Sequence, residues 1–262
     1  MVTRERVVEF VLPASALVLA LFAWEYFVWA EAVPPYVLPA PSLILKTLYL
    51  DWGTLFDSLL TTLRITFEAL LTAIFGGVAL AMLFAQSRLI ERTFFPFAVI
   101  MQVTPVVSIA PLLLVYLSTS AAVLVCAFLV AFFPILSNTA LGLASADHNL
   151  IDLFDLYRAS RLQQLMWLRV PSALPYFLGG LRIGGGLALI GAIVAEIAAG
   201  ASGQRAGLAY RIVESGFLLN IPRMFAALLL ISVAGILIFL FFTALSYLLL
   251  RRWHESARGR ET

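Results

Sequence analysis

Six long apolar stretches, each close to the length that crosses a lipid bilayer, constrain this chain more than any other feature. A helix needs roughly 20 mostly apolar residues to span the hydrocarbon core of a membrane. The six stretches are residues 8–30, 59–85, 93–117, 121–143, 176–199 and 225–250. They predict an all-α, polytopic membrane protein of about six transmembrane helices. No Gly/Ser linker or shift of composition divides the chain, so residues 1–262 are expected to form a single transmembrane domain.

The charge content agrees with a lipid environment. Charged residues make up 12% of the chain, against roughly 25% in soluble globular domains. The formal net charge of +2 is small and its basic residues are scattered. Nucleic-acid binding needs basic residues gathered on one face, so membrane lipid is an expected partner and nucleic acid is not.

The positions of lysine and arginine predict the orientation, because loops rich in them stay in the cytoplasm. With the amino terminus inside, eleven of the 17 basic residues fall on inner segments and two, Arg64 and Arg182, lie within helices. The four on outer segments are Lys46, Arg205, Arg211 and Arg223. Both termini are therefore expected in the cytoplasm. The prolines of the outer segment 31–57 are expected to lead into a short interfacial helix at 42–50.

The inner segment at about 145–172 carries apolar residues at helical spacing. Leu150, Phe154 and Tyr157 recur at i, i+4 and i+7. The same kind of spacing is found at Leu162, Leu165, Met166 and Arg169. Two short amphipathic helices joined near Arg158 are predicted.

Five ionisable residues within the apolar stretches need an explanation, because such groups are costly in a membrane. They are Glu25, Arg64, Glu68, Arg182 and Glu196. Arg64 and Glu68 are four residues apart, which favours an ion pair on one helix face, with a substrate contact as the alternative. For Glu196, a role at the outer mouth of a pathway and simple interfacial solvation both stay open.

Two spans have unusual backbones. The third contains Pro105 and Pro111, which remove backbone donors and are expected to kink it, either along a translocation pathway or for packing alone. The fifth contains Gly180 and Gly184 in a G-x-x-x-G pattern that permits close helix contact. The single cysteine, Cys126, is interpreted as a small packing or lipid-facing residue.

No catalytic, metal-binding or cofactor-binding motif is found in the sequence. The only lysine is Lys46, far from any glycine-rich turn, and no G-x-x-x-x-G-K-[ST] loop occurs. We therefore expect no catalytic residue, no metal and no cofactor in this chain, with any ATP bound by a partner subunit.

The inner segment resembles the EAA loop of binding-protein-dependent ABC importer permeases. The residues that carry the likeness run from Asp152-Leu-Phe-Asp-Leu-Tyr-Arg-Ala-Ser to Pro171 and Pro175. The wider chain is similar to the nitrate, sulfonate and taurine permease family, which includes permeases for thiamine-precursor pyrimidines. This likeness rests on Leu38-Pro-Ala-Pro41, Thr62-Leu-Arg64, Ala110-Pro-Leu112, Phe133-Pro-Ile-Leu-Ser-Asn-Thr139, Val194-Ala-Glu196 and Gly207-Leu-Ala-Tyr210.

The resemblance implies a permease homodimer in the bacterial inner membrane that receives a small polar solute from an external binding protein. Two cytoplasmic ATPase subunits would energise it through the inner loop, with Pro171 and Pro175 ending that loop and restarting the fifth helix. The coupling residues would be Asp152, Leu153, Phe154, Arg158, Ala159, Ser160, Arg161 and Pro171. We expect the pathway near Gln102, Thr104, Pro105, Ser108 and Asn138, with Glu196 toward its outer end.

The loop departs from the family pattern at two places. Asp152, Leu153 and Phe154 stand where the family has Glu-Ala-Ala, and Arg158 stands where it has glycine. A left-handed backbone at a residue other than glycine costs roughly 1 to 2 kcal/mol. Either the turn is built differently here or the docking of the ATPase is altered.

Three other classes of protein were weighed. A secondary transporter driven by an ion gradient would predict an internal repeat and acidic pairs at mid-membrane. An intramembrane enzyme would need a facing nucleophile and base. A passive scaffold would leave the amphipathic inner loop unexplained.

Overall fold

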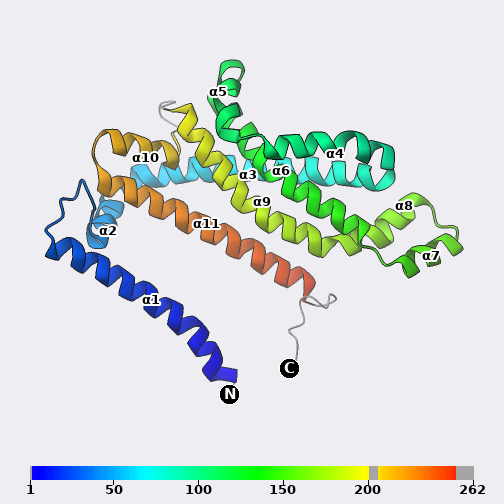
Figure 1. The fold of residues 1–262 in the computed structure, drawn as a ribbon, viewed down its shortest axis with the longest axis horizontal. Helices are drawn as coiled ribbons and strands as arrows, with labels where there is room; N and C mark the ends of the chain where they lie inside the picture. The colour runs from blue at the N-terminus through cyan, green and yellow to red at the C-terminus, as the bar shows by residue number, and fades with distance from the viewer. Residues whose placement is uncertain (1, 201–205, 252–262) are drawn as a thin grey trace.

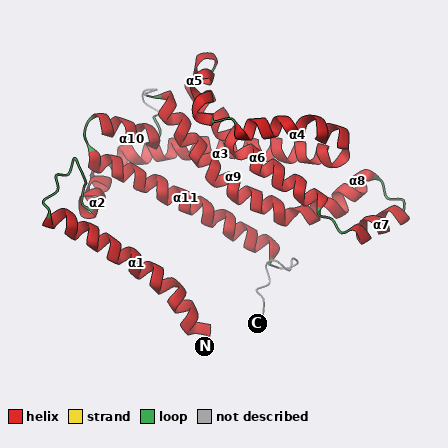
Figure 2. Ribbon diagram, viewed as in Figure 1, coloured by secondary structure: helices red, strands yellow, loops and turns green. Residues whose placement is uncertain are grey.

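The computed structural model describes residues 2–200 and 206–251, with side chains from residue 11 onward, and every regular element in these ranges is a helix (Figures 1 and 2). The elements are α1 (Val2–Ala30), α2 (Pro41–Leu50), α3 (Trp52–Gln86), α4 (Arg88–Val103), α5 (Val106–Tyr116), α6 (Thr119–Ala144), α7 (His148–Leu156), α8 (Arg161–Gln164), the π-helix η1 (Leu165–Arg169), α9 (Val170–Ala199), α10 (Leu208–Phe217) and α11 (Ile221–Leu250).

The expected all-α membrane fold with about six spans is confirmed. Five helical segments of the described chain are long and apolar enough to cross a membrane: 11–30, 52–86, 119–144, 161–199 and 221–250. The sixth is a broken span, in which α4 and α5 meet at 99°. The break lies at Thr104 and Pro105, both in extended backbone, with Pro105 preceding the first residue of α5. The expected kink of this span is thus present at Pro105, whereas Pro111 lies inside α5.

The long helices run between two ends of the molecule (Figure 1). At one end α2 and α10 pack on the beginnings of α3 and α11, around the buried side chains of Ile44, Leu55, Leu208 and Ala227. At the other end α7 and α8 extend away from the bundle (Figure 1). We call these the α2–α10 end and the α7–α8 end. The predicted helix at 42–50 is confirmed as α2, whereas α10 was not anticipated from the sequence.

The core lies where α3, α6 and α9 pack together, and glycines allow their close approach. A Cβ added at Gly180 would come within 2.8 Å of the Asn138 Cβ and 2.9 Å of the Pro134 carbonyl oxygen. One added at Gly184 would lie 3.0 Å from Ile135 Cγ1. The two glycines of the G-x-x-x-G pattern therefore lie where α9 packs against α6. Cys126 is fully buried within this packing, on α6.

Helix α1 stands apart from the bundle in Figure 1 and is attached mainly at its carboxyl end. Glu25 accepts hydrogen bonds from the backbone N–H of Ser42 (3.0 Å) and from its hydroxyl (2.6 Å). Because Ser42 is in the first turn of α2, Glu25 satisfies a backbone donor that the helix itself leaves unpaired. The ring of Trp24 lies 5.9 Å from that of Phe225 on α11. The hydrogen bonds to Ser42 thus give Glu25 a structural role in attaching α1 to α2.

The expectation that Pro171 and Pro175 interrupt the chain before the fifth span is wrong. From Arg161 to Ala199 the helix is continuous, with a π-helical turn at Leu165–Arg169 just before Pro171. In an α-helix a proline ring clashes with the carbonyl four residues earlier. The wider π turn precedes the proline and lengthens the hydrogen-bonded ring, with the N–H of Val170 donating to the Leu165 carbonyl.

Part of the basis for the predicted orientation lies outside the described residues. Arg205, Arg252, Arg258 and Arg260 are among the basic residues used for it, and the side chains of Arg4 and Arg6 are not described.

Candidate functional site

The turn between α7 and α8 keeps a left-handed backbone at Arg158, where φ is 54°. The N–H of Ala159 donates to the Phe154 carbonyl and the N–H of Arg158 donates to the Asp155 carbonyl, both at 2.9 Å. These two bonds make a Schellman motif, the helix ending that usually places glycine at the left-handed position. The turn therefore has the geometry that glycine usually adopts, with arginine in its place. Of the two possibilities raised by the sequence, a differently built turn is excluded.

Side chains fix the second helix of the loop against the first. Ser160 begins α8 with a capping box, in which its backbone N–H donates to Gln163 Oε1 (2.7 Å) and its hydroxyl accepts from the Gln163 N–H (3.3 Å). The side-chain amide of Gln164 donates to the carboxylate of Asp155. Asp152 lies three residues before Asp155 on the same helix and is exposed. Asp155, which the sequence reading did not single out, is thus the acidic residue that holds the two helices together.

The loop carries an open hollow of about 620 Å³. It is lined by Leu153, Phe154, Tyr157, Arg158, Ala159, Gln163 and Trp167. Tyr157 is 79% exposed and Trp167 is 77% exposed. Large aromatic side chains that are exposed together mark interaction surfaces in proteins. Four of the eight predicted coupling residues, Leu153, Phe154, Arg158 and Ala159, line this hollow, whereas Trp167 was missed.

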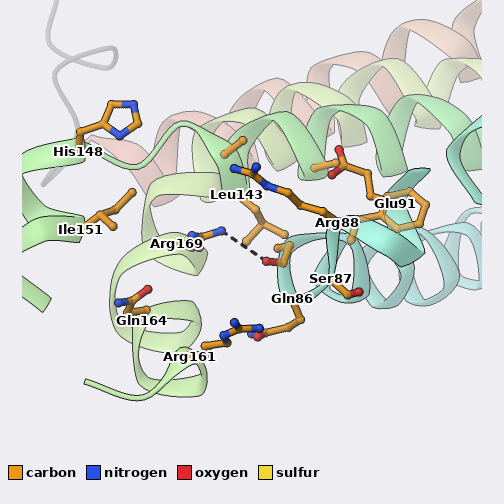
Figure 3. Close-up of a pocket in the computed structure, with 14 residues that line it drawn as sticks. Gln86, Ser87, Arg88, Glu91, Leu143, His148, Ile151, Arg161, Gln164 and Arg169 are labelled. Carbon is orange, nitrogen blue, oxygen red and sulfur yellow. Dashed lines mark hydrogen bonds between the residues drawn. The ribbon is translucent and has the colours of Figure 1, made fainter. Parts of the chain in front are cut away.

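A second cavity, of about 730 Å³, lies between the loop and the ends of α3, α4 and α6 (Figure 3). Its basic side chains are Arg88, Arg161 and Arg169, and Glu91 and His148 also line it. Arg169 donates to the carbonyl of Ala85 at 3.4 Å, a bond drawn in Figure 3. Arg161 therefore lies on the side of the loop that faces the bundle, away from the aromatic hollow.

The predicted pathway residues fall into three separate places. Gln102, Thr104, Pro105 and Ser108 gather at the break between α4 and α5, where the Thr104 hydroxyl donates to the Ile100 carbonyl (2.6 Å). Asn138 packs against α9 at Gly180, and its amide donates to the Pro134 carbonyl (2.8 Å). Glu196 is buried near the α2–α10 end. The broken helix thus brings four of the six together, and the other two stand on α6 and α9.

Glu196 is the centre of a buried polar network that joins three helices. Its carboxylate accepts from the Thr62 hydroxyl (2.9 Å) and from the Ala209 backbone N–H (3.1 Å). Thr62 in turn accepts from the Leu208 N–H at 2.9 Å. Leu208 and Ala209 are the first residues of α10, so the network satisfies donors at the amino end of that helix. Glu196 also lines a cavity of about 250 Å³, together with Arg64, Glu68 and Tyr210.

The predicted ion pair between Arg64 and Glu68 is confirmed. Arg64 Nε lies 2.7 Å from Glu68 Oε1, on the same face of α3. The cavity beside Glu196 therefore holds a paired charge and a carboxylate whose hydrogen bonds are made.

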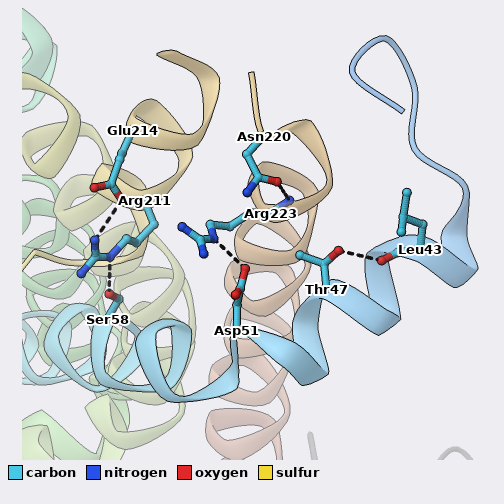
Figure 4. A network of polar contacts seen from close by, with 8 residues as sticks. All are labelled: Leu43, Thr47, Asp51, Ser58, Arg211, Glu214, Asn220 and Arg223. Carbon is cyan, nitrogen blue, oxygen red and sulfur yellow. Dashed lines mark hydrogen bonds and ion pairs between the residues drawn. The ribbon is translucent and has the colours of Figure 1, made fainter. Parts of the chain in front are cut away.

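Two further ion pairs at the α2–α10 end were not anticipated, since their partners are distant in sequence or lie in an unpredicted helix (Figure 4). Arg223 Nε lies 2.6 Å from Asp51 Oδ2 and links the beginning of α11 to the turn between α2 and α3. Arg211 on α10 donates to the Ser58 hydroxyl (3.0 Å) and pairs with Glu214 (2.9 Å). The hydrogen bond from Arg211 to Ser58 holds α10 to α3, and the pair of Arg223 and Asp51 holds α11 to the turn between α2 and α3.

Comparison with known proteins gives consistent matches over most of the chain. The model of the family described as "binding-protein-dependent transport system inner membrane component" matches residues 73–255. The formylaminopyrimidine transport permease protein ThiX of Halalkalibacterium halodurans is 33% identical over 86% of this chain and 89% of its own length. The riboflavin transport system permease protein RibX of Chloroflexus aurantiacus is 32% identical over 94% of this chain and 90% of its own length.

A solved structure of an amino acid ABC transporter shares the fold, with a TM-score of 0.62 and 19% identity over 78% of this chain and 96% of that chain. The six spans, the helical loop between the fourth and fifth of them and these matches lead to one conclusion: the chain belongs to the family of binding-protein-dependent transport system inner membrane components, the permease subunits of ABC importers.

Proposed function

We propose that this permease subunit couples to a separate ATPase through the aromatic hollow of its α7–α8 loop. The observation that carries the proposal is the joint exposure of Tyr157 and Trp167 beside a hydrogen-bonded turn. An amphipathic helix that fits a groove on a partner transmits a movement of that partner to whatever the helix is joined to. Here α8, η1 and α9 form one continuous helix, so a displacement at Trp167 is carried directly into the membrane span.

The orientation follows from the same proposal. The α7–α8 end lies in the cytoplasm and the α2–α10 end lies outside, with both termini in the cytoplasm. Six arginines of the described chain support this, because they lie at the α7–α8 end: Arg88, Arg92, Arg158, Arg161, Arg169 and Arg251. Of the basic residues at the other end, Arg211 and Arg223 are paired with carboxylates.

The partner subunits supply the ATP chemistry and deliver the solute. Two cytoplasmic ATPase subunits bind and hydrolyse ATP, and an external binding protein presents the solute at the α2–α10 end. The permease itself works as a homodimer, with no cofactor of its own. The solute is a small polar molecule of the sulfonate, taurine, nitrate or pyrimidine-precursor class. The names of relatives for aliphatic sulfonates, taurine, nitrate and formylaminopyrimidine support this range.

Co-purification of the permease with its cognate ATPase subunit tests the docking surface. We expect Tyr157→Ala and Trp167→Ala together to weaken the association by roughly tenfold or more, since buried aromatic residues dominate interface energies. Tyr49→Ala is the matched control, because Tyr49 is 83% exposed but lies on α2 at the opposite end. Unchanged co-purification of the double variant would show that the ATPase binds elsewhere.

A further inference from the structure

Three arginines surround the cavity between the α7–α8 loop and the ends of α3, α4 and α6 (Figure 3). They come from three elements, because Arg88 begins α4, Arg161 begins α8 and Arg169 ends η1. The side chains of Arg88 and Arg169 extend toward one another in Figure 3. The ion pairs found in the described part of the chain involve none of the three arginines. The cavity thus gathers guanidinium groups that no ion pair neutralises.

The rest of the lining also favours an anion. Among the described residues around the cavity Glu91 is the one carboxylate, against three arginines, and His148 lines it as well. Ser87, the N-cap of the 16-residue helix α4, lies on the lining, so the amino end of that helix meets the same space. Such a helix end carries a partial positive charge and unpaired backbone N–H groups, which bind phosphate oxygens. The volume of about 730 Å³ suits a small ligand, since such sites measure about 300 to 1,000 Å³.

The cavity lies at the boundary between lipid headgroups and hydrocarbon. Arg88, Glu91 and Arg92 fall within the first five residues of α4, and the rest of this helix carries no charged residue. Phe94 and Phe97 follow directly and are 52% and 61% exposed, as side chains that face lipid are. Charged side chains are costly inside the hydrocarbon, so the headgroup layer lies at the first turn of α4, beside the cavity.

From these observations we propose that this cavity binds a phosphate group, and that the group is the headgroup phosphate of an anionic phospholipid of the surrounding membrane. The N–H fork of a guanidinium pairs with two phosphate oxygens at once. Basic pockets between membrane helices bind anionic lipid headgroups in this way. A zwitterionic lipid carries the same phosphate but also a cation of its own, which three arginines repel.

The bound headgroup connects the loop to the membrane spans. Arg88 belongs to α4, whereas Arg161 and Arg169 belong to the continuous helix that leads into α9. Arg169 also donates to the Ala85 carbonyl of α3 at 3.4 Å. A phosphate shared by these arginines holds α8 and η1 against the turn between α3 and α4. The cavity shares no lining residue with the aromatic hollow, so the lipid and the ATPase occupy different sides of the loop.

Lipid binding by the purified permease–ATPase complex tests the proposal. The complex is freed of lipid in detergent and titrated with phosphatidylglycerol or with phosphatidylcholine of the same acyl chains, and bound lipid is counted by native mass spectrometry. We expect tighter binding of phosphatidylglycerol. Arg88→Gln should raise its apparent Kd roughly tenfold, because a charge-assisted hydrogen bond is lost, and Arg88→Lys should raise it less. Arg251→Gln is the matched control, since Arg251 is exposed at the same end of the molecule, on α11, and does not line the cavity.

Inorganic phosphate distinguishes the two sources of the phosphate group. Phosphatidylglycerol should stay bound in millimolar inorganic phosphate, because its acyl chains add apolar contacts. Its displacement would overturn the lipid assignment and show that free phosphate is the ligand. Equal binding of the two lipids, or equal effects of Arg88→Gln and Arg251→Gln, would overturn the site itself. The Arg88 side chain is exposed and the measurement requires neither transport nor ATP hydrolysis, so a negative result leaves the proposed function untouched.

Discussion

Thr62 on α3 and Glu196 on α9 share a hydrogen bond of 2.9 Å in the protein interior, although 134 residues separate them in the chain. Both side chains are buried, with exposed fractions of 1% and 5%. The same two residues accept from the first two N–H groups of α10, Leu208 and Ala209. One threonine and one glutamate therefore hold a surface helix onto two membrane spans.

Replacement of Thr62 by valine should loosen α10. Valine has nearly the same shape but no hydroxyl, so it leaves the Leu208 N–H unpaired and the Glu196 carboxylate short of one donor. An unsatisfied buried polar group costs about 1 to 3 kcal/mol. We expect the purified protein to unfold at a lower temperature and α10 to become sensitive to protease. Thr72→Val is the control, because the Thr72 hydroxyl bonds only to carbonyls of its own helix, and an equal effect of both variants would contradict the network.

Alanine at Gly207 should disturb the same network from the other side. A Cβ at this position would overlap the Glu196 carboxylate, which has no room to withdraw while it holds Thr62 and Ala209. Gly216 on α10 has only Met224 Sδ near its would-be Cβ, at 3.9 Å. We therefore expect Gly207→Ala to lower the yield of folded protein, measured by size-exclusion chromatography, and Gly216→Ala to leave it intact. Normal behaviour of Gly207→Ala would mean that the loop before α10 is free to shift.

Two adjacent glycines of α9 should respond to alanine in opposite ways. At Gly180 the new methyl group meets Asn138 and the Pro134 backbone, and overpacking of this kind costs about 1 to 3 kcal/mol. At Gly179 it meets nothing, and alanine is favoured over glycine in a helix by about 1 kcal/mol. Thermal unfolding of the two variants measures the difference. Equal midpoints would show that α6 and α9 are less tightly packed than the geometry requires.

The sequence predicted the spans well because hydrophobic length is a local property. The predicted spans 8–30, 121–143 and 225–250 correspond to α1, α6 and α11, and most of their ends agree within a few residues. The helices α1, α3 and α11 begin earlier than the apolar stretches that predicted them. The early starts contain charged, polar or aromatic residues, which lower the mean hydropathy of the first turns. Helix α10 was missed for a related reason, since its polar face makes it look like a loop.

The sites were harder to predict because they depend on contacts between distant residues. The break that carries four of the proposed pathway residues was predictable, because Pro105 is a local sequence signal for an interrupted helix. The roles of Glu196 and Asp51 depend on partners 134 and 172 residues away, and no spacing rule in a single sequence reveals them. The continuity of the helix past Pro171 was also beyond the pattern, because proline ordinarily signals a break and the π turn that accommodates it has no signature in the sequence.

Glycine at position 158 should make the α7–α8 turn more stable. Arg158 has a φ of 54°, a conformation that costs roughly 1 to 2 kcal/mol for residues with a Cβ and almost nothing for glycine. We expect Arg158→Gly to slow hydrogen exchange of the Ala159 amide, which bonds to Phe154, by roughly fivefold. Arg158→Val should accelerate it, since β-branched residues tolerate this region least. Faster exchange in the glycine variant would mean that contacts of the arginine side chain outweigh the backbone strain.

The ion pair between Arg223 and Asp51 should contribute measurable stability because it is short, half-buried and spans two helices. Its atoms lie 2.6 Å apart, and the side chains are 26% and 23% exposed. Pairs at exposed sites contribute up to about 1 kcal/mol, and partial burial raises the loss when one partner is removed, because the remaining charge is left unpaired. In a double-mutant cycle we expect Arg223→Met and Asp51→Asn each to lower the unfolding temperature. The double variant should lose less stability than the sum of the two single variants, and the difference is the coupling energy of the pair. The matched cycle at Arg64 and Glu68, where the arginine side chain is 73% exposed, should give a coupling energy close to zero in detergent. If the two cycles gave equal coupling, the burial of the Arg223–Asp51 pair would have no energetic consequence, and the attachment of α11 to the α2–α3 turn would have to come from the apolar contacts of Leu55 and Ala227 alone.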